Sequence, residues 1–215
     1  LASCLAISGK RSLLIDLDPQ ANSTSFLGID KSTVITSTYE VVVNGVPIRE
    51  AVLSTSVNRL DILPSAIRLV GAEVEMVEMS RRESRLREAL ADENLPYEFV
   101  IIDCPPSLNI LTLNALVASG SILIPVQTEY FALEGLGMLL DTINRVRGSL
   151  NPELEIEGVL LTMYDSRLNL SRQVEAEARK FFAGKVYQTV IQRNVRLAEA
   201  PGFGKPIVMY DMLSV

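Results

Sequence analysis

Short apolar runs alternate along this chain with segments of helical spacing. Two of the runs end on acidic residues, namely SLLIDLD at 12–18 and FVIID at 99–103. A short continuous apolar run is typical of a strand that is buried on both faces of a parallel sheet. Four further runs predict strands, at 60–63, 121–126, 157–164 and 186–191.

The segments between these runs predict helices. Helical spacing covers 80–91, a segment near 131–147 and a segment near 170–182, and the opening LASCLAIS also predicts a helix. Gly9 then stands where a left-handed residue ends a helix. Strands that alternate with helices predict an α/β fold, with a mostly parallel β-sheet and helices on both faces. Without an internal repeat or a linker, we expect one domain over 1–215. The least regular stretch, 19–58, predicts a long functional connection.

Composition excludes several kinds of chemistry. The chain has no histidine, which excludes a Ser-His-Asp triad and every His-ligated zinc site. Cys4 and Cys104 lie far apart in the sequence, and we expect both to be reduced thiols. The net charge of −6 argues against a protein that coats nucleic acid by bulk charge. No apolar run reaches the roughly 18 residues of a membrane span, so the expected location is the cytoplasm.

Acidic residues stand at the ends of two predicted strands. Asp16 and Asp18 follow one strand and Asp103 ends the other, and ligands of open parallel sheets bind beyond such strand ends. FVIID matches the Walker B strand of P-loop NTPases, whose Asp holds Mg²⁺. The alternative is structural, because Asp18 and Pro19 also fit a helix N-cap and its first position. The phosphate-binding motif GxxxxGK[ST] does not occur in the 215 residues.

Several long motifs in the same order resemble the ParA/Soj family of chromosome- and plasmid-partitioning ATPases, which have a deviant Walker A P-loop. They are DLDPQAN, IIDCPPS, IPVQTEYFALEGLGMLLDTI, GVLLTMYD and RNVRLAEAPGFGKPI. The resemblance implies a P-loop NTPase-like fold. It also implies that a strand, the P-loop and the start of a helix precede Leu1, and that a final helix follows the chain. We therefore expect one ParA-type ATPase domain over 1–215, truncated at both ends.

The resemblance also implies roles for individual residues at an ATP and Mg²⁺ site. Asp18 matches the acid that positions or activates the attacking water, so it is the expected catalytic residue. Asp16 matches the acid beside the Mg²⁺ shell, and Asp103 matches the Walker B acid. Pro105 falls in a segment similar to switch II, which senses the nucleotide.

Arg193 and Asn194 match a segment beside the adenine, usually written P-R-N. In this chain Gln192 replaces the proline.

Two arginines, Arg167 and Arg196, match family positions for non-specific DNA binding. Charge supports this independently, because eight basic and four acidic residues between 160 and 205 make that window +4. A few phosphate contacts would give sequence-independent, salt-sensitive binding. The alternative is an ordinary solvated helix face.

The resemblance thus implies an ATPase for chromosome or plasmid segregation. An ATP-bound homodimer would bind nucleoid DNA, and a centromere-binding partner of the ParB type would stimulate hydrolysis. One alternative is a membrane-positioning relative such as MinD, although we expect no membrane partner. Two others are an interaction protein with a decayed P-loop and an iron–sulfur ATPase.

Overall fold

The structure, a computed structural model, describes residues 1–91, 95–129 and 134–214. The chain forms two compact units. Unit 1 comprises residues 1–118 and 196–214, and unit 2 comprises residues 119–195.

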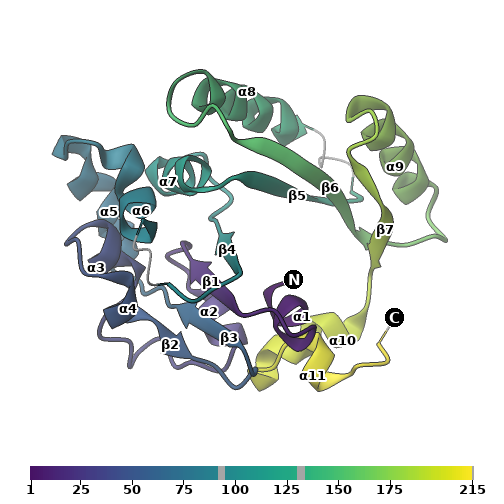
Figure 1. Cartoon of the computed structure of the whole chain (residues 1–215). Helices are drawn as coiled ribbons and strands as arrows, with labels where there is room; N and C mark the ends of the chain where they lie inside the picture. Colours follow the sequence, from purple (N-terminus) through teal and green to yellow (C-terminus); the bar gives the residue numbers. More distant parts are fainter. Residues whose placement is uncertain (92–94, 130–133, 215) are drawn as a thin grey trace. The chain divides into compact units, whose positions relative to one another are not determined.

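Unit 1 is built on a four-stranded sheet with the order β2-β3-β1-β4 (Figure 1). The strands are β1 (Ser12–Asp16), β2 (Leu53–Ser54), β3 (Leu60–Leu63) and β4 (Phe99–Asp103). β1 pairs in parallel with both β3 and β4, whereas the short β2 runs antiparallel to β3.

Helices cover both faces of this sheet. Successive side chains of a strand point to opposite faces. Leu13 and Ile15 of β1 belong to the larger core, which the helices α3 to α7 help to form, and Leu14 packs against the smaller core with α1. The helices are α1 (Ala2–Ile7), α3 (Thr38–Val42), α4 (Ile48–Ala51), α5 (Leu69–Glu75), α6 (Arg85–Leu90) and α7 (Ile110–Ala118). The expectation of helices on both faces is confirmed for unit 1.

Shorter elements complete unit 1. They are α2 (Asn22–Phe26), η1 (Met76–Glu78), η2 (Arg82–Ser84), η3 (Ala200–Phe203) and α11 (Ile207–Tyr210), with α10 (Val195–Glu199) leading into the last segment. The stretch 19–58 was expected to be the least regular part of the chain, but it contains α2, α3, α4 and β2.

Unit 2 is a three-stranded parallel sheet with the order β5-β6-β7. Its strands are β5 (Ser121–Gln127), β6 (Glu155–Tyr164) and β7 (Val186–Gln192), and its helices are α8 (Glu134–Ser149) and α9 (Asn169–Phe181). The two helices lie along one side of the sheet (Figure 1). The start of the helix expected near 131–147 lies outside the described residues.

All six predicted strands are present, and the mostly parallel α/β class is confirmed. Two details differ. The strands form two sheets among the described residues, whereas one sheet was expected. Apolar runs in a sequence do not show which strand lies beside which, so the sequence did not predict this separation. The run at 99–103 was expected to be buried, yet Phe99 is 41% and Val100 is 38% exposed. Among the described residues, β4 stands at the end of its strand order and pairs with β1 alone.

Gly9 has φ of +92°, as expected for the residue that ends α1. In the part of the chain that the structure describes, no helix is both long enough and apolar enough to span a membrane.

Candidate functional site

The acidic ends of β1 and β4 lie side by side in unit 1. Asp16 is the register partner of Asp103 in the parallel pair. One residue beyond the strand, the Leu17 amide donates to the Asp103 carbonyl oxygen at 2.8 Å. The two strand-end carboxylates expected to cooperate are therefore neighbours.

Asp16 is fully buried, and its side chain accepts three hydrogen bonds. Its Oδ2 accepts from the Thr24 amide at 2.8 Å and from Thr24 Oγ1 at 2.7 Å, and its Oδ1 accepts from the Asp18 amide at 3.2 Å. Burial raises the pKa of Asp16 to about 6, against the opposing effect of the Thr24 bonds, and Asp103 raises it further. This carboxyl anchors the start of α2.

Asp103 is only half-buried and contacts the same helix. Ser23 Oγ donates to its Oδ2 at 2.6 Å. Two consecutive residues of α2, Ser23 and Thr24, thus hold the two carboxylates. The chain turns into α2 at Ala21, which has φ of +54°. Reasoning from the sequence missed Ser23 and Thr24. The only available signal was the cluster of short polar residues directly after DLDPQ.

A second set of hydrogen bonds joins this site to the end of β3. Thr24 Oγ1 accepts from the Ser65 amide at 3.0 Å. Thr38 Oγ1 bonds the carbonyl oxygens of Asp16 at 2.7 Å and Pro64 at 3.1 Å. The carboxyl ends of β1 and β3 are therefore fixed by buried hydroxyl groups.

Asp18 lies in a turn beyond β1 and is half-buried. Its Oδ1 accepts from the Gln20 amide at 2.9 Å, and its carbonyl oxygen accepts from the Ala21 amide at 2.8 Å. Because α2 begins only at Asn22, the alternative that Asp18 is a helix N-cap is wrong. Pro19 and Gln20 occupy a turn instead of a first helical turn.

Whether Asp16 and Asp103 can bind Mg²⁺ depends on how much of the acceptor capacity of each carboxylate is already used by protein donors. In the part of the chain that the structure describes, Asp16 has three protein donors and Asp103 has one, so Asp103 has more capacity to bind a cation. Magnesium is usually held by one or two carboxylates together with phosphate and water. Within residues 1–91, 95–129 and 134–214, no three His, Cys, Asp or Glu side chains are placed to bind a metal together. This donor set fits a magnesium ion that depends on a bound phosphate.

The segment after β4 carries Cys104 and Pro105. Burial raises the pKa of the Cys104 thiol to about 12, and the neighbouring Asp103 adds to this, so the sulfur is not a ready thiolate ligand. Pro105 is buried. Two residues on, the Ser107 carbonyl oxygen accepts from Thr112 Oγ1 of α7 at 2.6 Å, which fixes the path of this segment.

Arg167 and Arg193 both lie close to Asp165 in unit 2. Arg167 Nε and Nη2 donate to the two oxygens of Asp165 at 2.9 and 2.7 Å. These bonds, with a smaller effect of the Arg193 charge, lower the pKa of Asp165 to about 2. Arg193 is exposed, and Asn194 beside it is partly buried.

Arg196 lies in unit 1, and carboxylates also hold it. Its Nη1 pairs with Glu199 at 3.0 Å and its Nε with Asp211 at 3.7 Å. The two arginines expected to bind DNA are therefore in different units. Each has an acidic partner that the sequence reasoning did not assign.

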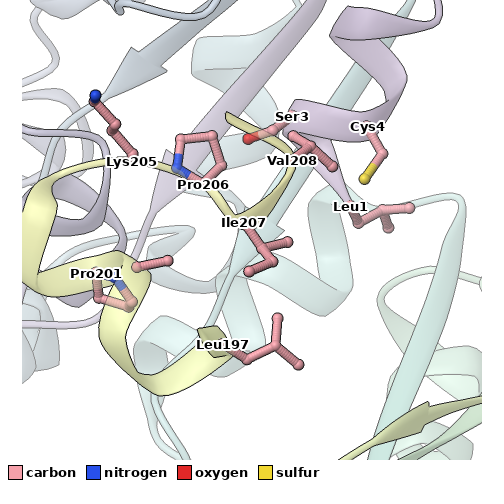
Figure 2. A pocket seen from close by; sticks show the side chains of 10 residues that line it. Leu1, Ser3, Cys4, Leu197, Pro201, Lys205, Pro206, Ile207 and Val208 are labelled. Atoms are coloured by element: carbon pink, nitrogen blue, oxygen red, sulfur yellow. The ribbon is translucent and has the colours of Figure 1, made fainter. Parts of the chain in front are cut away.

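Unit 1 also contains a pocket of about 210 Å³ between the start of α1 and the segment from η3 to α11 (Figure 2). Leu1, Cys4, Pro201 and Ile207 line it, and Lys205 adds a charge at its edge. None of the site residues predicted from the sequence lines this pocket.

Comparison with known proteins agrees with this geometry. A family model described as "AAA domain" matches residues 1–156. The "Sporulation initiation inhibitor protein Soj" of Bacillus subtilis is 54% identical over 211 residues, which are 98% of this chain and 83% of that protein. The "Chromosome partitioning protein ParA" of Caulobacter vibrioides NA1000 is 50% identical, over 99% of this chain and 80% of that protein.

The solved structure of cobyrinic acid a,c-diamide synthase from Mycobacterium smegmatis, with bound ADP and magnesium, is similar to this chain, with a TM-score of 0.85 and 36% identity. The match covers 94% of this chain and 83% of that one. The fold and the carboxylate site at the ends of β1 and β4 thus define a protein of the P-loop NTPase class. Within that class, the chain belongs to the ParA/Soj family of chromosome-partitioning ATPases. The resemblance seen in the sequence motifs is confirmed.

Proposed function

We propose that this protein is a chromosome-partitioning ATPase that binds ATP with Mg²⁺ and, as an ATP-bound homodimer, holds DNA without regard to sequence. A ParB-type centromere-binding protein is the proposed partner that stimulates hydrolysis. The observation that carries the proposal is the pairing of Asp16 with Asp103 at adjoining strand ends, both held by α2. The names of the related Soj and ParA proteins support the partitioning role.

Asp103 is the residue proposed to hold Mg²⁺, with Asp16 behind it. When bound, Mg²⁺ would neutralise charge on the phosphates of the nucleotide. Asp16 contributes by holding α2, and through it the Ser23 hydroxyl, against Asp103. GxxxxGK[ST] does not occur in the 215 residues, so we propose that the phosphate-binding loop comes from a part of the full-length protein outside them.

Asp18 is the proposed catalytic residue. Its turn places a half-buried carboxylate just beyond the end of β1, and the Gln20 amide fixes one of its oxygens. A carboxylate that is fixed in this way can orient a water molecule and accept its proton. Such a group acts on the transition state more than on nucleotide binding.

Pro105, Arg193 and Asn194 are the proposed nucleotide contacts. Pro105 lies two residues beyond Asp103, the last residue of β4, as expected of a segment that senses the bound nucleotide. Arg193 and Asn194 follow the end of β7, and the Arg193 amide donates to the Tyr164 carbonyl oxygen at 2.9 Å. This bond fixes the backbone beside the proposed adenine contact.

Arg167 and Arg196 are the proposed DNA contacts. Their side chains are 87% and 56% exposed, so both can reach a phosphate. Arginine binds carboxylate and phosphate oxygens with the same planar set of donors. DNA phosphates would therefore compete with Asp165 and Glu199 for these arginines. A protein held by DNA in this way would be associated with the nucleoid in the cytoplasm.

The proposed ATPase role is tested with Asp18→Ala in the full-length protein. Because Asp18 acts on the transition state, turnover should fall by at least about 100-fold, while ATP affinity changes by less than about threefold. Asp30→Ala is the matched control, since Asp30 is an exposed turn acid that bonds Ser32. Phosphate release at the parental rate from Asp18→Ala would contradict the proposed role.

A further inference from the structure

We infer that the close contact between Gly28 and Gly204 is a positioning contact, which links the carboxylate site at one end of α2 to the segment that carries Arg196. Through this contact, DNA binding by Arg196 depends on which nucleotide is bound at the carboxylate site. This inference rests on the proposed function, because it concerns the same DNA and nucleotide sites. All the residues involved belong to unit 1.

The first part of the link is the attachment of α2 to both carboxylates. Ser23 holds Asp103, and Thr24 holds Asp16 through both its amide and its hydroxyl. A helix of five residues is only about 7.5 Å long. Any rearrangement that shifts Ser23 or Thr24 therefore shifts the other end of α2 as well.

The second part is the contact between two glycine backbones at that other end. Gly28 and Gly204 have φ of +80° and +61°, which glycine adopts more readily than other residues. A Cβ atom on Gly204 would lie 2.7 Å from the Gly28 Cα, and one on Gly28 would lie 3.1 Å from the Gly204 carbonyl oxygen. The obstacle in each case is backbone, so a side chain at either position would push α2 and η3 apart.

The third part is the bracing of the segment 196–211 around Arg196. Arg196 pairs with Glu199 and Asp211, and the Tyr210 hydroxyl donates to Glu199 at 3.2 Å. The Phe203 ring stacks on the Tyr210 ring with centroids 5.0 Å apart. Phe203 is the direct neighbour of Gly204. A displacement at Gly204 is therefore passed to the groups that hold Arg196.

The variant that tests the link is Gly204→Ala in the full-length protein. Two controls isolate the contact. Gly202→Ala changes the same segment at a glycine with nothing within 4 Å of an added Cβ, and Gly9→Ala places alanine at a positive φ in open space. Affinity for a random-sequence duplex is measured with ATP and with ADP, and ATP affinity is measured separately with a fluorescent analogue.

Gly204→Ala should lower the ratio of DNA affinity in ATP to that in ADP by at least about fivefold, a coupling of the usual size, with ATP affinity nearly unchanged. Hydrogen exchange should increase at 22–28 and 196–211. Gly202→Ala and Gly9→Ala should keep the parental ratio. Gly28→Ala, whose added Cβ is less crowded, should lower the ratio by a smaller factor.

Three results would overturn the inference. If Gly204→Ala keeps the parental ratio, the inference is wrong. The proposed function is then unaffected, because the parent protein still shows ATP-dependent DNA binding. Loss of ATP binding together with DNA binding in both Gly204→Ala and Gly28→Ala would make the contact merely structural. If the parent protein itself shows no ATP-dependent DNA binding, the proposed function fails and the inference fails with it.

Discussion

Asp16 and Asp103 stand opposite each other at the ends of two paired strands, and each accepts a hydrogen bond from a different residue of α2. Ser23 bonds the half-buried carboxylate and Thr24 bonds the buried one. A helix that would be marginal alone is thereby fixed at its start. The arrangement leaves Asp103 as the more accessible acid and makes Asp16 its support.

Thr24→Val should destabilise unit 1. The substitution removes one donor from Asp16 and leaves the Ser65 amide without its acceptor, which costs about 1–3 kcal/mol for buried groups. The free energy of unfolding is measured with urea. Thr33→Val on an exposed turn is the control and should change this free energy by less than about 0.5 kcal/mol. Equal effects of the two substitutions would contradict the buried role of Thr24.

Arg167→Gln should raise the pKa of Asp165 from about 2 toward 3.8. The folded-state pKa lies below the ordinary value, so the ion pair stabilises the folded protein above about pH 3.8. That stabilisation is lost as the pH falls through about 2. Titration of the Asp165 carboxyl carbon by NMR measures the shift. Arg172→Gln is the control, because Arg172 bonds Asn169 instead, and it should leave the pKa of Asp165 near 2. If the pKa of Asp165 is unchanged in Arg167→Gln, the ion pair does not form in solution.

Asp165→Asn should strengthen DNA binding by the full-length protein. The substitution retains an acceptor oxygen for the turn and removes the charge that competes with phosphate for Arg167. Exposed ion pairs contribute up to about 1 kcal/mol, so affinity should rise by up to about fivefold. Glu177→Gln makes the same charge change on the exposed surface of α9. If it raises affinity equally, the effect is one of net charge, and Asp165 has no special role.

The backbone of this fold was largely predictable from the sequence, because buried strands leave a clear apolar pattern. The runs at 60–63 and 99–103 match β3 and β4 residue for residue, and the run at 12–18 contains β1. β2 was missed because its two residues are too short to form a pattern. The separation into two sheets was missed because strand pairing depends on contacts distant in sequence, such as Ser12 with Phe99.

The site was only partly predictable for the same physical reason. Asp16 and Asp103 could be expected to meet because parallel strands end at one edge. Ser23 and Thr24 could not be assigned, since their role depends on the left-handed turn at Ala21 that aims α2 at both acids. The pairing of Arg167 with Asp165 depends on a turn that brings residues two apart into contact.

The central claim is that the full-length protein binds DNA through arginine–phosphate contacts, independently of sequence and dependent on ATP. It is tested by titrating two unrelated labelled duplexes of equal length at several salt concentrations, with ATP and with ADP. We expect equal affinity for both duplexes, tighter binding with ATP, and a linear fall of log affinity with log salt. Arg196→Gln should reduce that slope by about 0.9 for each DNA phosphate that the variant no longer neutralises, and Arg145→Gln on α8 should not. A preference for one duplex, equal binding in ATP and ADP, or an unchanged slope in Arg196→Gln would contradict the claim.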